Sequence, residues 1–110
     1  MDRSHNKVAD GLADLTMDHQ LSWEKHYNVG KDPRECNIIV QTDGGRRTPS
    51  CAAASMVVGL FHGSTYEPWY AKGIYIATDH TVFQTEAIAL EAAVSWLACS
   101  LQQQKQRSFG

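Results

Sequence analysis

Apolar residues recur with helical spacing near the start of the chain. Val8, Leu12 and Leu15 follow one another at steps of three and four residues, with small apolar residues beside them. This period is typical of an amphipathic helix, which we expect over about residues 4–20. Gly11 lies within the segment and weakens the helix without cancelling it.

A longer helix is predicted after residue 80. Thr81 followed by Gln84 is a capping-box pattern, in which each side chain accepts a hydrogen bond from the backbone N–H of the other residue. The apolar residues beyond it repeat at three- and four-residue steps. We expect them to form the buried stripe of this helix: Ala87, Leu90, Val94, Leu97 and Leu101.

Three strands are predicted between the two helices. The first, residues 37–43, is rich in β-branched side chains and is expected to end at Gly44-Gly45, and the others cover residues 52–61 and 69–77. The pattern dissolves over residues 21–36, which we interpret as a connector. These elements predict an α/β fold with a three-stranded antiparallel meander, the long helix packed on it, and a separate N-terminal helix.

Length and composition limit the class of protein. A chain of 110 residues with 43% hydrophobic and 20% charged residues suits one small packed domain. The net charge of -2 lacks the basic balance of a high-affinity nucleic-acid binder, so nucleic acid would require a local basic patch or metal ions.

The expected location is intracellular, in the cytoplasm or nucleus. The polar N-terminus carries no signal peptide, and no uninterrupted apolar run approaches the roughly 20 residues of a membrane span, so no membrane partner is expected. The three cysteines lie far apart without a C-x-x-C pair, which favours reduced thiols.

Two carboxylates stand out as candidates for chemistry. Asp43 lies at the predicted end of a buried strand, where an ionised side chain needs a cation or hydrogen bonds, although an Asp-Gly pair also starts hairpin turns for local reasons. Glu86 lies in the first turn of the long helix, four residues before Leu90. We expect it to lean toward the sheet, while favourable placement at a helix N-terminus is the alternative.

Taken together, these segments resemble the first half of the ribonuclease H fold. The matching motifs are I-V-Q-T-D-G-G at residues 39–45, the strand at residues 70–77, and T-E-A-I-A-L-E-A-A at residues 85–93, within a resemblance that covers about residues 37–101. Residues 5–13 also resemble the N-x-x-A-D-x-L-A segment with which this family closes. Residues 1–20 would then be a closing helix, residues 21–36 a connector and residues 37–110 the first half of such a domain.

In that family the closing helix follows all the strands, whereas here it precedes them. Three explanations remain open. The chain is a circular permutant, it is a truncated product or a seam between two tandem copies, or the N-terminal match is chance. A connector of this length can span roughly 50 Å when extended, so the helix can reach its usual place.

The resemblance implies metal-dependent hydrolysis of the RNA strand in RNA–DNA hybrids. Asp43, Glu86 and Asp10 would be the catalytic carboxylates and would hold Mg²⁺ or Mn²⁺, with help from the Gly44 carbonyl. A hydrogen-bonded role for Asp10 at a helix start is the alternative. A further metal-binding Asp of the family, expected on a strand after the long helix, has no counterpart before Gly110. The alternative function is therefore an inactive, truncated module that associates with nucleic acid or protein.

Nucleic-acid contacts are predicted at four residues. Arg46 and Arg47 follow the T-D-G-G motif and are candidates for phosphate binding, although a solvated turn is a common place for such a pair. Gln84 is a candidate for contact with a 2′-hydroxyl group, and Asn6 would share a helix face with Asp10.

A second copy of the chain is the other expected partner. If strands are missing beside the first predicted strand, its edge would be open, and an open apolar edge pairs readily with another chain. Such a homodimer would involve Ile38, Ile39 and Val40.

Overall fold

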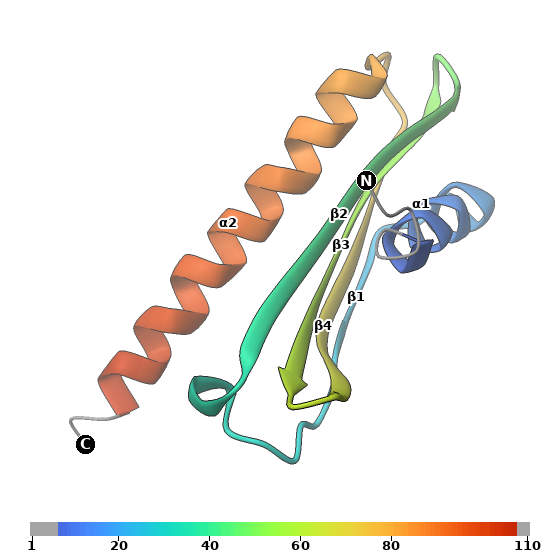
Figure 1. Cartoon of the computed structure of the whole chain (residues 1–110). Coiled ribbons are helices and arrows are strands. Elements are labelled where there is room, and N and C mark those ends of the chain that lie inside the picture. Colours follow the sequence, from blue (N-terminus) through green and yellow to red (C-terminus); the bar gives the residue numbers. More distant parts are fainter. Residues whose placement is uncertain (1–6, 108–110) are drawn as a thin grey trace.

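The computed structural model describes residues 7–107, with side-chain surroundings for residues 8–100. A single antiparallel sheet lies between two helices, one on each face (Figure 1). Its strand order is β1-β4-β3-β2. The elements, in chain order, are α1 (Lys7–His19), β1 (Trp23–His26), the 3-10 helix η2 (Pro33–Glu35), β2 (Asn37–Thr48), β3 (Cys51–His62), β4 (Thr65–Ile76) and α2 (Val82–Arg107).

The sheet has four strands, so the prediction of a three-stranded meander is wrong. The additional strand, β1, lies within the expected connector and pairs antiparallel with β4, with Trp23 opposite Gly73. Because Gly73 has no side chain, the indole of Trp23 and the hydroxyl of Thr16 occupy the space that a Cβ would fill. Tertiary packing forms β1, since its four residues carry no alternating pattern.

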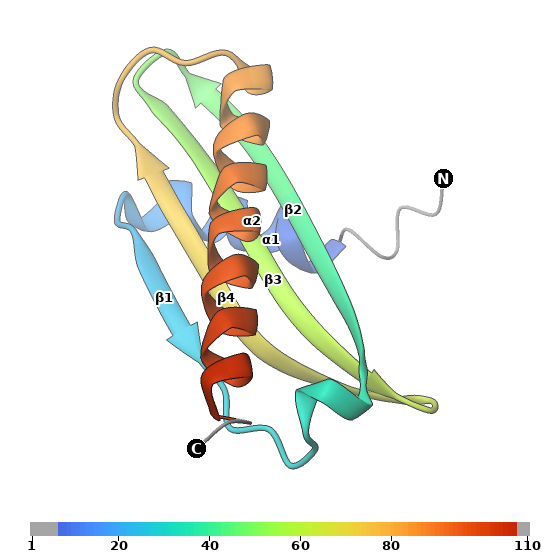
Figure 2. The same ribbon diagram turned by 90° about the vertical axis from the view of Figure 1, so that its left-hand side faces the viewer.

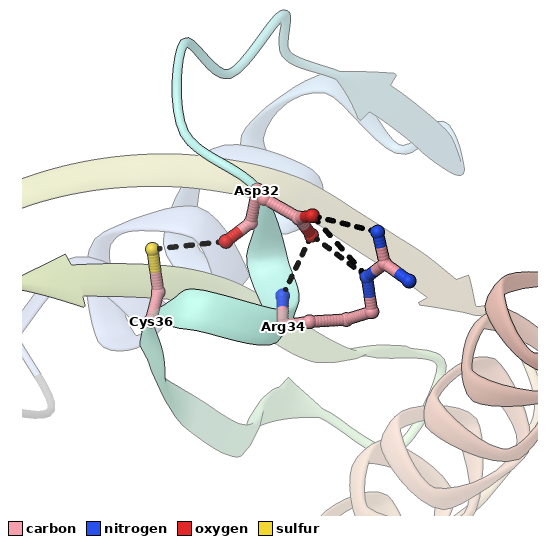
Figure 3. Close-up of polar contacts among 3 residues, drawn as sticks. All are labelled: Asp32, Arg34 and Cys36. Atoms are coloured by element: carbon pink, nitrogen blue, oxygen red, sulfur yellow. Dashed lines mark hydrogen bonds and ion pairs between the residues drawn. The ribbon is translucent and has the colours of Figure 1, made fainter. Parts of the chain in front are cut away.

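Residues 27–36, which include η2, connect β1 to β2. The Asp32 carboxylate accepts a 3.0 Å hydrogen bond from the Arg34 backbone N–H and forms a 2.8 Å ion pair with the Arg34 guanidinium (Figure 3). The Cys36 thiol lies 3.4 Å from the Asp32 carbonyl oxygen. These contacts close η2, after which the chain enters β2 at Asn37.

β2 continues through the two glycines to Thr48, so its predicted end at Gly44-Gly45 is wrong. Asp43 therefore lies inside a paired strand, and the hairpin-turn interpretation of Asp43-Gly44 is wrong as well. The reason is close packing on both faces. A Cβ at Gly44 would collide with the first turn of α2, and one at Gly45 would press on Met17 of α1 at 3.3 Å.

The other two predicted strands are confirmed with shifted ends. β4 begins at Thr65, before the Glu67-Pro68 step, and its register with β3 shifts between Val58 and Gly59. This irregularity accommodates Pro68, which cannot donate a hydrogen bond to the ladder.

α2 is confirmed as a long helix, and so is its capping box. The Thr81 N–H donates to Gln84 Oε1 at 2.8 Å, and the Gln84 N–H donates to Thr81 Oγ1 at 3.1 Å. The predicted buried stripe is wrong, because Leu90 is 55% exposed and Val94 is 66% exposed.

A neighbouring stripe of smaller residues faces the sheet instead. Its buried members are Thr85, Ala89 and Ala93, with Ile88, Ala92 and Trp96 half-buried beside them. Small side chains let the helix approach the sheet closely, so packing with the sheet selects this stripe over the one with larger residues.

α1 packs on the opposite face, so the prediction of a separate N-terminal helix is wrong (Figure 2). Ala9, Ala13, Thr16 and Met17 are buried there. The Trp23 indole N–H donates to Thr16 Oγ1 at 2.9 Å, and this hydroxyl donates to the Leu12 carbonyl at 2.7 Å.

The cysteines and the apolar span of α2 bear on the expectations of reduced thiols and of no membrane partner. All three cysteines are free thiols, with Cys99 exposed. Within α2, the span Val82–Ser100 has the length and mean hydropathy, 1.2, that would allow a membrane crossing. One side of this span packs on the sheet, 17% of the span is buried, and the exposed part includes Glu86 and Glu91.

Candidate functional site

Asp43 lies midway along β2, directly opposite Ser55 of β3. Neighbouring residues of a strand point to opposite faces of the sheet. The Gly44 position faces the start of α2, so the Asp43 side chain lies on the α1 face, together with that of Ser55. The sheet thus places a half-buried carboxylate under the first turns of α1.

Ser55 fixes α1 above this carboxylate. Its hydroxyl is buried and donates a 2.5 Å hydrogen bond to the carbonyl of Ala9. The next residue along α1 is Asp10, whose side chain lies close enough to that of Asp43 to raise its pKa. The structure therefore brings together two predicted site residues that are far apart in the sequence.

Glu86 reaches the same region from the other face. A Cβ at Gly44 would meet Thr85 Oγ1, the backbone nitrogen of Glu86 at 2.5 Å, and the carbonyl carbon of Thr85 at 2.6 Å. The glycine therefore sets how closely the first turn of α2 approaches β2. The Glu86 side chain itself is exposed, so the expectation that it leans into the sheet is wrong. That expectation relied on Leu90 being buried, and Leu90 is exposed.

The surroundings of Asp43 disfavour its ionised form. Burial is the largest cause, followed by the hydrogen bond and the negative charge of Asp10, and together they raise the pKa of Asp43 to about 6. A hydrogen bond from the Gly44 backbone N–H lowers the pKa, and the negative charge of Glu86 raises it slightly. A cation beside Asp10 and Asp43 would relieve this repulsion.

The fit of a divalent metal ion depends on how many ligands meet. Among the described residues, no three His, Cys, Asp or Glu side chains are grouped closely enough to hold a metal ion. The Asp10 and Asp43 carboxylates alone suit Mg²⁺, which is often held by one or two carboxylates and keeps several waters. The full ligand set expected with Glu86 is not assembled, although the negative charge of Glu86 acts on Asp43.

The arginines after the glycine pair have acidic neighbours. Arg47 forms a 2.6 Å ion pair with Asp18 and lies 3.6 Å from Asp14, both on α1. Arg46 lies 3.7 Å from Asp79 in the segment before α2. Both arginines are on β2, so the alternative that they occupy a solvated turn is wrong. Any phosphate would compete with these carboxylates.

Gln84 and Asn6 are the other two residues predicted to contact nucleic acid. Gln84 is exposed at the start of α2, where its Oε1 accepts the hydrogen bond of the capping box. Its amide N–H₂ group takes no part in the capping box. Asn6 lies outside the described residues.

Two site residues were missed in the sequence. Ser55 interrupts the otherwise apolar run A-A-A-S-M-V-V of β3, and a polar residue in such a run is a signal for a buried hydrogen bond. Thr85 is buried against Gly44, and its hydroxyl donates to the Val82 carbonyl at 2.7 Å. No pattern in the sequence distinguishes Thr85 from the exposed residues around it.

The chain matches no protein-family model, no curated protein and no solved structure.

Proposed function

We propose that this chain is a ribonuclease H-like module in which Asp10 and Asp43 bind Mg²⁺ or Mn²⁺ and support hydrolysis of RNA in an RNA–DNA hybrid. One observation carries the proposal: α1 docks on the sheet so that Asp10 meets Asp43. This contact gives the N-terminal motif a site, which favours a permuted arrangement over a chance match.

The roles of the residues follow from their positions. Asp43, held within β2, would bind the ion from the sheet, and Asp10 would bind it from the first turn of α1. Glu86 would add negative charge from the start of α2. A bound Mg²⁺ supplies Lewis-acid activation of water and neutralises charge on the phosphodiester. Arg46 and the Gln84 amide N–H₂ group are proposed to contact the nucleic acid.

A non-catalytic module is the second candidate. It is favoured by the lack of a three-ligand group among the described residues and by the ion pairs that occupy Arg47. In this case the chain would associate with nucleic acid or protein without hydrolysing a substrate.

The direct test is titration of the chain with Mg²⁺ or Mn²⁺, followed by NMR at Asp10, Asp43 and Glu86, and then cleavage of a labelled RNA–DNA hybrid. The enzyme proposal expects saturable Mg²⁺ shifts at Asp10 and Asp43, and cleavage that Asp43→Asn abolishes. Metal-independent cleavage would reject the proposal. No cleavage at any metal concentration would also reject it and would leave the association module.

Glu91→Gln is the matched control for Glu86→Gln. Both residues are exposed glutamates on α2, but Glu86 alone contributes charge at Asp43. We expect Glu86→Gln to weaken Mn²⁺ binding severalfold and Glu91→Gln to leave it unchanged. Equal effects would mean that Glu86 acts only through the overall charge of the helix.

A further inference from the structure

Three aspartates of α1 lie along one side of the helix. Asp10, Asp14 and Asp18 follow one another at steps of four residues, and we call this set the α1 acidic stripe. The two ends of the stripe meet two residues of β2. Asp10 lies beside Asp43, and Asp18 forms an ion pair with Arg47. The stripe therefore faces the strand that carries the candidate site carboxylate.

The spacing of these two contacts agrees between the helix and the strand. Asp10 and Asp18 are eight residues apart, which is about 12 Å along a helix at a rise of 1.5 Å per residue. Asp43 and Arg47 are four residues apart, which is about 13 Å along a strand at roughly 3.3 Å per residue. Both contacts can therefore form at once, and a shift of α1 along β2 would break both.

Arg47 is the extra residue of a β-bulge. The pairing of β2 with β3 shifts by one residue between Arg46 and Thr48, so Arg47 has no counterpart on β3. Such an extra residue bends its strand and re-aims the side chain, and bulges are common next to functional sites. Arg46 has a regular partner in Ala52 and lies 3.7 Å from Asp79, which is outside α1. The two neighbouring arginines therefore bind different parts of the molecule.

The guanidinium of Arg47 makes three contacts with α1. Its Nη1 donates to the Asp18 carboxylate at 2.6 Å, and its Nη2 lies 3.6 Å from Asp14 Oδ1 and 3.3 Å from the Asp14 carbonyl oxygen. At the other end of the stripe, the negative charges of Asp10 and Asp43 repel each other. Attraction at Arg47 thus offsets a repulsion that would push the first turns of α1 away from β2.

We propose that Arg47 is a positioning residue of the candidate site, whose ion pairs with α1 hold Asp10 against Asp43. Ser55 fixes α1 at Ala9, and a helix fixed at one point can pivot. Arg47 fixes a second point near the end of the helix, from the same strand as Asp43. In this role Arg47 binds α1 rather than a phosphate group. The inference rests on the proposed function for the use of the site, whereas the docking of α1 can be measured without metal.

Titration of the whole chain with Mn²⁺ tests the role of Arg47. Loss of a positive charge should by itself strengthen binding of a cation. We expect Arg47→Gln to weaken Mn²⁺ binding instead, by about threefold, which is the scale of an exposed ion pair. Arg46→Gln is the matched control, because it removes the same charge one residue away without touching α1, and it should not weaken binding. Unchanged or tighter binding by Arg47→Gln, or equal weakening in both variants, would overturn the proposal.

The Asp10→Asn chain separates positioning from a general effect on the fold. If Arg47 acts through Asp10, Arg47→Gln should cause no further loss of Mn²⁺ affinity when Asp10 is already replaced. The same loss with and without the Asp10 carboxylate would make the role of Arg47 merely structural and overturn the proposal. Arg47→Lys keeps a cation beside Asp18 and should retain part of the affinity. A lysine variant as weak as the glutamine variant would contradict the ion pair as the cause.

Hydrogen exchange without metal measures the docking of α1 by itself. Amides of α1 in Arg47→Gln should exchange severalfold faster than in the parent, because the helix opens more readily, while amides paired between β3 and β4 keep their rates. Arg46→Gln should leave the exchange of α1 unchanged. If Arg47→Gln also left it unchanged, the proposal would fail whether or not the chain binds Mn²⁺. Faster exchange in a chain that binds no Mn²⁺ would reject the proposed function and leave Arg47 as the residue that positions α1.

Discussion

The Ser55 hydroxyl donates a 2.5 Å hydrogen bond to the Ala9 carbonyl, and the same Ser55 lies directly opposite Asp43 in the sheet. One buried side chain therefore determines where the first turns of α1 lie relative to the carboxylate of β2. Since Asp10 follows Ala9, this hydrogen bond places the two carboxylates of the candidate site in contact.

Replacing Ser55 should reduce both stability and metal binding. Ser55→Ala removes the donor to Ala9, and we expect the free energy of unfolding to fall by about 1 kcal/mol. Because α1 then loses its anchor beside Asp43, Mn²⁺ binding should weaken as well. Chemical denaturation and metal titration of the variant measure the two effects.

Thr16→Val is the control for this substitution. Thr16 is a second buried hydroxyl on α1, and it bonds to Trp23 and Leu12 away from Asp43. The variant should lose a similar amount of stability and keep its metal affinity. If it lost both equally, Ser55 would have no specific part in positioning Asp10.

Gly44→Ala should displace the start of α2. The new Cβ would collide with backbone atoms of Thr85 and Glu86, which cannot rotate away, so a loss of about 1–3 kcal/mol is expected. Gly45→Ala is the matched control, since its Cβ would meet the flexible end of Met17 at 3.3 Å. Thermal denaturation should therefore show the larger fall for Gly44→Ala, and equal falls would contradict the packing described here.

Stability should depend on pH through Asp43. Its pKa is raised from the usual 3.8 to about 6 in the folded chain, so folding favours the protonated form. The contribution of this group to stability therefore falls as pH rises from about 4 to about 6, and the penalty remains above that range. At pH 7.5, Asp43→Asn should be more stable than the parent by on the order of 1 kcal/mol after solvent screening.

Denaturant unfolding across this pH range measures the difference between the two proteins. The advantage of Asp43→Asn should disappear below about pH 3, where the parent carboxyl group is protonated in both the folded and the unfolded chain. Saturating Mg²⁺ at pH 7.5 should reduce the advantage too, because a bound cation offsets the repulsion in the parent. A variant less stable than the parent at pH 7.5 without metal would refute the assigned cause.

The capping box should contribute measurably to α2. Thr81→Ala removes the acceptor for the Gln84 N–H, and we expect a loss of about 1 kcal/mol. Thr81→Ser keeps the hydroxyl and should restore most of that stability. Circular dichroism during thermal unfolding of both variants makes the comparison, and an Ala variant as stable as the Ser variant would exclude the cap as a source of stability.

The local elements could largely be predicted from the sequence. The helical spacing of Val8, Leu12 and Leu15 marks α1, and the Thr81 and Gln84 pair marks the start of α2. These signals depend on residues close together in the chain, so they operate before any tertiary contact forms. The apolar runs of β2 and β3 are likewise local signals, carried by residues close together in the chain.

The faces of the helices and the extent of the sheet depended on tertiary structure. Periodicity selects the larger residues of α2, such as Leu90, whereas the sheet packs against Ala89 and Ala93 because smaller side chains let the layers approach closely. β2 continues through Gly44 for the same reason. The contact between Asp10 and Asp43 joins two carboxylates on separate elements, and only the docking of α1 on Ser55 brings them together. The sequence by itself thus determined the helices, the main strands and the candidate carboxylates, while long-range packing determined which surfaces meet.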